Sequence, residues 1–191
     1  MNREVLLELF RTSGALLAGH FRLTSGLHSP GYLQCALVLQ HPQHAEMLGR
    51  AIADRVRDLR STVVLSPALG GVVIGQEVGR ALGVRAIFVE RQDGALTLRR
   101  GFIIGESDRV LVVEDVVTTG GSTRETMQVA RAAGGQVVGA ASIVDRGRGV
   151  ELGVPYVSLV QIDLPTFEPD QCPLCAQGMP VIKPGSRPVA T

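Results

Sequence analysis

Two adjacent carboxylates and a run of small residues form the part of the sequence best suited to chemistry. Glu114 and Asp115 follow four apolar residues, and the small-residue run TTGGS (118–122) comes shortly after them. Backbone N–H groups in such a turn, with a helix N-terminus behind it, bind a phosphate without a lysine. Carboxylates at a strand end accept hydrogen bonds from sugar hydroxyls or hold a magnesium ion through water. The stretch therefore predicts a sugar-phosphate site.

A well-capped strand-to-helix turn is the plainer interpretation of the same stretch. Ser122 and Glu125 have the spacing of a capping box, in which side chains satisfy the first free N–H groups of a helix. This interpretation accounts for Ser122. It does not account for two carboxylates placed directly after a buried strand, where their desolvation must be compensated. We therefore favour the ligand site.

Short apolar strands separated by helical stretches must position these residues. The pattern predicts strands over 32–39, 63–65, 85–90, 109–114, 136–144 and 157–162, and helices over 4–10, from Pro42 to 59, over 71–82 and over 122–133. This alternation is typical of an α/β fold with a parallel sheet flanked by helices on both faces. Ligands of such sheets bind at the carboxyl ends of the strands.

The length of 191 residues indicates a single domain over 1–191, with a small N-terminal hood region (1–40) and an irregular, proline-rich tail (164–191). Lys183 is the only lysine, so any mechanism using a lysine from the body of the chain is excluded. The net charge of +1 gives no electrostatic case for a nucleic-acid partner. The N-terminus lacks the apolar core of a signal peptide, and no uncharged run is long enough to span a membrane. With three cysteines, we expect a reduced, cytoplasmic protein.

The stretch from Val110 to Glu125 resembles the phosphoribosyl diphosphate (PRPP) signature of type I phosphoribosyltransferases. The resemblance implies that Glu114 and Asp115 hold the ribose 2′- and 3′-hydroxyls and that 118–122 binds the 5′-phosphate. It also implies Mg²⁺ as the cofactor. We assign no side chain of this chain as a direct metal ligand. The residues implied to bind PRPP are Glu114, Asp115, Val116, Val117, Thr118, Thr119, Gly120, Gly121, Ser122 and Arg91.

Four further segments resemble the orotate phosphoribosyltransferase family, which makes orotidine 5′-phosphate and pyrophosphate from orotate and PRPP. They are FRLTSGLHSP with Tyr32 (21–32), SPALGG (66–71), FVER (88–91) and IVDRG (143–147). The resemblance implies that Arg146 pairs with the orotate carboxylate, that Thr118 helps to orient the base, and that 66–71 receives pyrophosphate. It also implies the fold of that family and a homodimer.

The segment 91–108 interrupts the alternation of strands and helices and predicts a hairpin or a mobile flap. The family commonly has two lysines and a histidine in this loop and a lysine at the position of Thr24, whereas this chain has Arg91, Arg99 and Arg100 in the loop. Arginine retains the charge and binds phosphate in a bidentate manner, but it does not donate a proton near neutral pH. We predict that Arg99 and Arg100 close over the pyrophosphate, and with Asp115 they are our candidate catalytic residues.

Two other functions fit the same sequence. A type I enzyme for a purine base would share the PRPP signature, although an arginine after Asp145 suits an acidic base better. A PRPP-sensing regulator with this fold would normally carry a DNA-binding segment or a basic surface, and the near-neutral charge argues against both.

Cys172 and Cys175 form a C-x-x-C pair. A structural zinc site needs four ligands, and no second pair exists in the sequence. Cys35 or a histidine (His20, His28, His41 or His44) could supply the others, but no spacing supports this. We therefore expect free thiols, with zinc or a disulfide as the alternatives.

Overall fold

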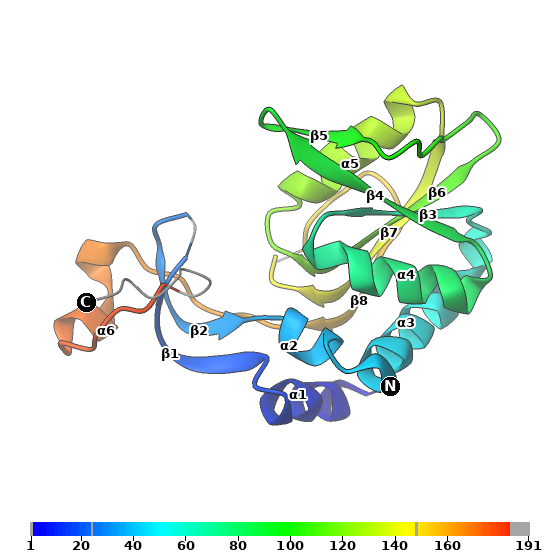
Figure 1. The fold of residues 1–191 in the computed structure, drawn as a ribbon. Coiled ribbons are helices and arrows are strands. Elements are labelled where there is room, and N and C mark those ends of the chain that lie inside the picture. Colours follow the sequence, from blue (N-terminus) through cyan, green and yellow to red (C-terminus); the bar gives the residue numbers. More distant parts are fainter. Residues whose placement is uncertain (1, 24, 148, 184–191) are drawn as a thin grey trace.

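A computed structural model describes residues 2–23, 25–147 and 149–183 of the chain and contains two sheets (Figure 1). The six-stranded sheet has the order β5-β4-β3-β6-β7-β8, and β1 pairs with β2 in a separate antiparallel hairpin. The strands are β1 (Leu16–Arg22), β2 (His28–Leu33), β3 (Val63–Pro67), β4 (Arg85–Gln92), β5 (Ala95–Leu98), β6 (Arg109–Val117), β7 (Gln136–Asp145) and β8 (Tyr156–Gln161). The helices are α1 (Arg3–Thr12), α2 (Ala36–Leu39), α3 (Pro42–Val56), α4 (Gly70–Leu82), α5 (Gly121–Ala132) and α6 (Pro173–Ala176), with 3₁₀ turns at Arg57–Leu59 and Pro169–Gln171.

The six-stranded sheet is parallel except for β5, which pairs antiparallel with β4. Helices α3 and α4 cover one face and α5 covers the other (Figure 1). The central strand β6 is apolar on both faces: Leu111 and Val113 belong to the core under α3 and α4, while Val110 and Val112 belong to the core under α5. The predicted α/β fold with a parallel sheet between helices is therefore confirmed.

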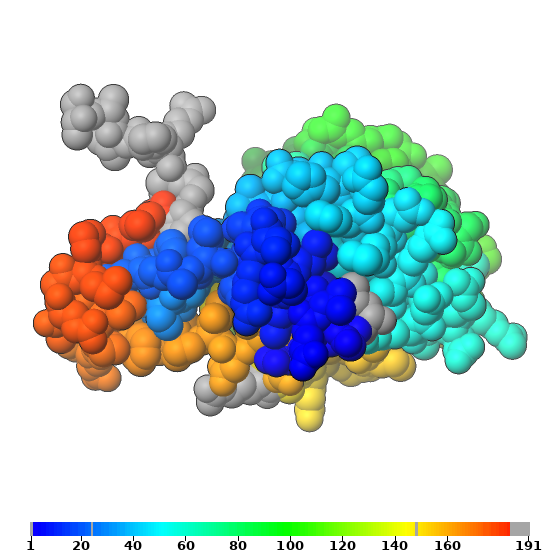
Figure 2. Space-filling model, turned by 90° about the horizontal axis from the view of Figure 1, so that it is seen from below, coloured from blue at the N-terminus to red at the C-terminus, as the bar shows by residue number. Residues whose placement is uncertain are grey.

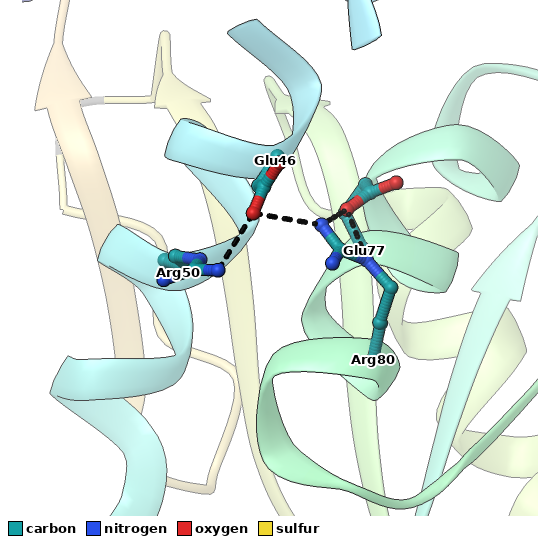
Figure 3. A network of polar contacts seen from close by, with 4 residues as sticks. All are labelled: Glu46, Arg50, Glu77 and Arg80. Carbon is teal, nitrogen blue, oxygen red and sulfur yellow. Dashed lines mark hydrogen bonds and ion pairs between the residues drawn. The ribbon is translucent and has the colours of Figure 1, made fainter. Parts of the chain in front are cut away.

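Helices α3 and α4 are also joined by a network of charged side chains, shown in Figure 3. Glu46 accepts from Arg50 at 2.7 Å and lies 3.4 Å from Arg80, which in turn pairs with Glu77 at 2.6 Å. The two arginines are exposed and the two glutamates partly exposed, so the ion pairs contribute little compared with the apolar contacts between the helices.

The hairpin β1–β2 stands apart from the six-stranded sheet and packs against the C-terminal segment 164–183 (Figures 1 and 2). Backbone bridges join Phe21 to Ile182 and His28 to Phe167. We call residues 16–33 and 164–183 the hairpin–tail unit. Of the expected irregular tail, residues 184–191 lie outside the described part of the chain.

The element boundaries differ from the sequence predictions in three places. The strand predicted over 32–39 is wrong: β2 ends at Leu33, and 36–39 forms the short helix α2, which buries Val38 and Leu39 in the core. Strand β1 was not predicted, because its partner strand is needed to recognise it. Strand β6 continues to Val117 because β7 pairs with it up to Asp145. Glu114 and Asp115 therefore lie within the strand rather than at its end.

The capping box considered as the alternative interpretation of the start of α5 does not form. The N-cap residue is Gly120, and its φ of 76° lies in the left-handed region that glycine adopts without strain. Glu125 instead accepts from the backbone N–H of Leu96 at 2.7 Å and pairs with Arg91. None of the described helices is long and apolar enough to cross a membrane.

Candidate active site

The carboxyl ends of β3 and β6 lie side by side at the centre of the sheet, where the chain order reverses. From β3 the chain crosses to β4 on one side, whereas from β6 it crosses to β7 on the other. Ligands of open α/β sheets bind at such a switch point. A cavity of about 1430 Å³ opens here. It is lined from the sheet by Leu69, Gly70, Asp115, Val116, Thr118, Thr119, Arg146 and Gly147.

The two adjacent carboxylates face opposite sides of the sheet, because side chains alternate along a strand. Asp115 lines the cavity, and its carboxylate lies so close to Gly70 that a Cβ there would be 2.7 Å from Oδ1. Glycine at position 70 is thus required for the loop after β3 to approach Asp115. Burial raises the pKa of Asp115 above its ordinary value, even though backbone N–H groups donate to its carboxylate.

Glu114 points toward α5, is 7% exposed and accepts a hydrogen bond from Thr123. Burial raises the pKa of Glu114 to about 7, an effect opposed by the bond from Thr123 and reinforced by the neighbouring Asp115. Glu114 is not among the described residues that line the cavity. The structure therefore separates two residues that the sequence suggested would act together.

The turn from Thr118 to Ser122 joins β6 to the N-terminus of α5. Thr118 and Thr119 are exposed and line the cavity, and the first free N–H groups of α5 follow them. Arg124 braces the turn, because its guanidinium donates to the carbonyl of Thr119 at 2.7 Å and to that of Glu151 at 2.8 Å. This arrangement has the features of an anion site: free N–H groups, the positive end of a helix dipole and hydroxyl donors.

Arg146 follows the last residue of β7 and faces the same cavity, beside Tyr32 of the hairpin. Its guanidinium is half-buried, its Nε has no hydrogen-bond partner, and no carboxylate forms an ion pair with it within 2–23, 25–147 and 149–183. Burial lowers the pKa of Arg146, which remains a cation at neutral pH. A half-buried cation without a counter-ion favours the binding of a ligand anion at this end of the cavity.

The three arginines of the segment 91–108 lie elsewhere. The segment forms the predicted hairpin, built from β4 and β5 with Asp93 and Gly94 at its turn. Arg91 pairs with Glu125 at 2.8 Å, and Arg100 binds both oxygens of Glu90 at 2.7 and 2.8 Å. Arg99 is exposed, and none of the three lines the cavity among the described residues. Thr24, the other departure from the family pattern, lies outside the described residues.

Comparisons with known proteins identify the family of the chain. The model of the phosphoribosyl transferase domain family matches residues 36–163. The orotate phosphoribosyltransferase of Pelotomaculum thermopropionicum is 52% identical over 190 residues, 99% of this chain and 100% of that protein. The chain belongs to the orotate phosphoribosyltransferase family. A second member, from Heliobacterium modesticaldum, is 53% identical over 98% of this chain and 100% of its own length.

Solved structures of orotate phosphoribosyltransferases share the fold. The enzyme from Aeropyrum pernix superimposes with a TM-score of 0.70 at 28% identity, over 82% of this chain and 93% of that chain. The Mycobacterium tuberculosis enzyme in complex with PRPP superimposes with a TM-score of 0.64 at 26% identity, over 82% of this chain and 95% of that chain. The type I phosphoribosyltransferase fold inferred from the sequence is confirmed.

Sequence reasoning missed several residues that complete the cavity of this orotate phosphoribosyltransferase. Cys35 is 2% exposed and lines it, with a pKa raised well above the ordinary value by burial and then by Asp115. The start of the C-terminal segment, Leu164-Pro165-Thr166, also lines it. No local pattern in the sequence marks these residues. Cys35 and the tail reach this side of the sheet only in the folded chain.

Proposed function

We infer that this chain transfers the 5-phosphoribosyl group of PRPP to orotate in the synthesis of the pyrimidine nucleotide UMP. A bond forms between the base nitrogen, which loses its proton, and the anomeric carbon. The bond from that carbon to pyrophosphate breaks, and pyrophosphate leaves with the electron pair. The observation that carries this proposal is Arg146, a half-buried cation without a carboxylate partner among the described residues, in the same cavity as the turn at 118–122.

The residues of the cavity divide the substrates between them in this proposal. The turn of residues 118–122 and the N-terminus of α5 bind the 5′-phosphate through N–H and hydroxyl donors. Asp115 accepts from the ribose hydroxyls and so fixes the position of the anomeric carbon. The role of Glu114 at these hydroxyls stays a prediction, because its carboxylate accepts from Thr123 and Glu114 is not among the described residues that line the cavity. Arg146 binds the carboxylate of orotate and Thr118 orients the base. The protein thus acts by positioning and charge stabilisation and supplies no nucleophile.

Magnesium fits this cavity as an ion that arrives with PRPP. Asp115, beside the loop at 66–71, and Asp163 are the two acidic side chains of the described cavity lining, so most of the oxygen ligands of Mg²⁺ must come from substrate and water. When bound, Mg²⁺ lowers the charge of the pyrophosphate leaving group. Asp115 would hold it indirectly, through the ribose hydroxyls.

The arginines of the 91–108 hairpin are proposed to bind pyrophosphate, either after a movement of the hairpin or in the cavity of a second copy. None of the three is among the described residues that line the cavity of their own chain, which supports a homodimer in which the hairpin serves the neighbouring site. The three free cysteines support a location in the reducing cytoplasm.

The role of the hairpin is tested by Arg99→Ala and Arg100→Ala. Each variant should lower turnover by about 10-fold or more, because a charge-assisted bond to the leaving phosphate is lost. Glu90→Gln is the matched control: it releases Arg100 from its carboxylate partner without removing the cation, so it should retain turnover. If both arginine variants turn over like the wild type, the hairpin does not act on pyrophosphate.

The choice of base is tested by measuring PRPP consumption with orotate, adenine, guanine, hypoxanthine and uracil separately. We expect turnover with orotate alone. Arg146→Ala should lower kcat/KM for orotate by about 100-fold or more, because removing one partner of a partly buried charge pair costs several kcal/mol. The exposed Arg131→Ala serves as the control. Turnover with a purine would favour a purine enzyme, and PRPP binding without turnover of any base would favour a regulator.

A further inference from the structure

Four side chains at the joint of the hairpin–tail unit converge on one point that the proposed reaction does not use. They are His20 of β1, His28 of β2, and Cys172 and Cys175 at the start and within α6. One ligand atom from each lies within 4.8 Å of all the others. The sequence separations between the histidines and the cysteines exceed 140 residues, so the folded chain alone reveals the cluster.

The distances between these atoms are those of a tetrahedral ligand set. His20 Nε2 lies 2.9 Å from His28 Nδ1, 3.5 Å from Cys172 Sγ and 3.7 Å from Cys175 Sγ, and Cys175 Sγ lies 3.3 Å from His28 Nδ1. Around a tetrahedral zinc ion with nitrogen at about 2.1 Å and sulfur at about 2.3 Å, neighbouring ligand atoms are about 3.4–3.8 Å apart. Of these four distances, the one between the two nitrogens falls furthest below this range, so the histidines must move apart to admit the ion.

The hydrogen bonding of His20 leaves the correct nitrogen available. Its Nδ1 donates to the carbonyl oxygen of Met179 at 2.8 Å, since that oxygen can only accept. Nε2 therefore carries a lone pair directed at the cluster, where it is within hydrogen-bond distance of His28 Nδ1. A histidine ligand held by a backbone carbonyl through its other nitrogen is the usual outer-shell arrangement of a metal site.

The turn after the cysteines supports the same geometry. The N–H of Gly178 donates to the carbonyl of Cys175 at 2.9 Å, and the N–H of Met179 donates to that of Leu174 at 3.0 Å. This tight turn returns the chain to the cluster, where the carbonyl of Met179 meets His20. The same residues thus place both the thiols and the group that orients a histidine.

The burial of these side chains and the charge of two thiolates favour the binding of a divalent cation. His20 is 1% exposed and Cys172 is 3% exposed, so His20 Nε2 and Cys172 Sγ are removed from water and have mainly the other atoms of the cluster as partners. Two thiolates and two neutral imidazoles around Zn²⁺ make a site with no net charge. We propose that His20, His28, Cys172 and Cys175 bind one zinc ion that fastens the C-terminal segment to the hairpin β1–β2. Because the protein supplies all four ligands, the site is structural. Zinc binding displaces the thiol protons and involves no redox step.

Metal analysis of the protein after removal of any affinity tag tests the proposal. The wild type should contain about one zinc ion per chain, as expected for a closed four-ligand site. Cys175→Ser is the most informative variant, because Cys175 is the exposed ligand and its replacement disturbs packing least. It should lose the zinc, whereas the matched controls Cys35→Ala and His41→Gln, which change residues outside the cluster, should retain it.

Cobalt substitution supplies a second readout that does not depend on stability. Co²⁺ bound to the wild type should give the intense visible bands of a tetrahedral site and a thiolate charge-transfer band, both lost in Cys175→Ser. A chelator should also lower the Tm of the wild type but not that of the variant. A wild type that binds less than about a tenth of an equivalent of zinc, or a Cys175→Ser variant that retains zinc, would overturn the proposal. A disulfide between Cys172 and Cys175 or a bound iron in place of zinc would overturn it equally.

Discussion

The acidic pair on β6 and the His–Cys cluster of the hairpin–tail unit both bury ionisable groups, but they compensate for burial differently. Burial raises the pKa of Glu114 to about 7, which favours its protonated form, whereas the bond from Thr123 favours the carboxylate. The cluster, in our proposal, is neutralised by a metal ion. Asp115, next to Glu114, faces the cavity, where we propose that substrate hydroxyls donate to it. Protonation, a metal ion and a substrate would thus be three different ways to compensate for burial in one chain.

The comparison also shows which kind of site can be recognised from the sequence and which cannot. The phosphate turn is contiguous: strand, carboxylates, turn and helix follow one another within the segment 110–125. The cluster joins residues near the two ends of the chain. A motif whose residues are adjacent in sequence can be recognised from the sequence alone. A site whose residues are far apart in sequence can be recognised only when the fold of the intervening chain is known.

Of the changes that test this comparison, Asp115→Asn should have the largest effect. Loss of charge-assisted bonds to two ribose hydroxyls should lower kcat/KM for PRPP by about 100- to 1000-fold. The zinc content and the Tm decrease caused by a chelator should stay as in the wild type, because the cluster belongs to another part of the molecule. Asp54→Asn on the exposed surface of α3 is the control. An Asp115→Asn enzyme with wild-type kinetics would remove Asp115 from the site.

The raised pKa of Glu114 predicts a pH dependence of stability. Its pKa is raised from 4.5 to about 7 in the folded protein, so between these values the folded state binds more protons than the unfolded state. The free energy of unfolding therefore falls as pH rises through this window, by about 2–3 kcal/mol for this group. Glu114→Gln keeps an acceptor for Thr123 and should remove that slope.

Urea unfolding at pH 5 and pH 8 measures the effect, with the exposed Glu106→Gln as the control. The difference in unfolding free energy between wild type and Glu114→Gln should favour the wild type more at pH 5 than at pH 8. An equal difference at both values would mean that Glu114 is ionised when buried, and the contrast with the metal cluster would disappear.

A smaller effect is expected where the two regions meet. Tyr32, at the end of the hairpin, lies beside Arg146, so loosening the hairpin–tail unit should affect the base more than PRPP. Cys175→Ser should raise KM for orotate by about 3- to 10-fold, the range typical of coupling through packed elements. KM for PRPP should change less, and His41→Gln should change neither. Equal changes in both KM values would mean that the unit supports the whole fold rather than the base end of the cavity.

Much of the fold was predictable because the strands of the sheet are short, apolar and separated by amphipathic helices. The α/β class, the phosphate turn and the position of Arg146 after a strand end all follow from local patterns. The opposite orientation of Glu114 and Asp115 depends on β6 continuing to Val117, which its pairing with β7 determines. The capping role of Ser122 failed because Glu125 has partners on the β4–β5 hairpin. In each case a contact distant in sequence decided the outcome.

The backbone bridges that join β1 and β2 to Ile182 and Phe167 have a consequence for the order in which the enzyme forms during synthesis. The hairpin leaves the ribosome first, whereas Met179, the partner of His20, follows 159 residues later. All six strands of the sheet and the phosphate turn precede those partners in the order of synthesis. The wall of the cavity that contains Leu164, Pro165 and Thr166 is the last part of the cavity lining to be synthesised. The residues proposed to bind phosphate and base are thus made before those that close the cavity.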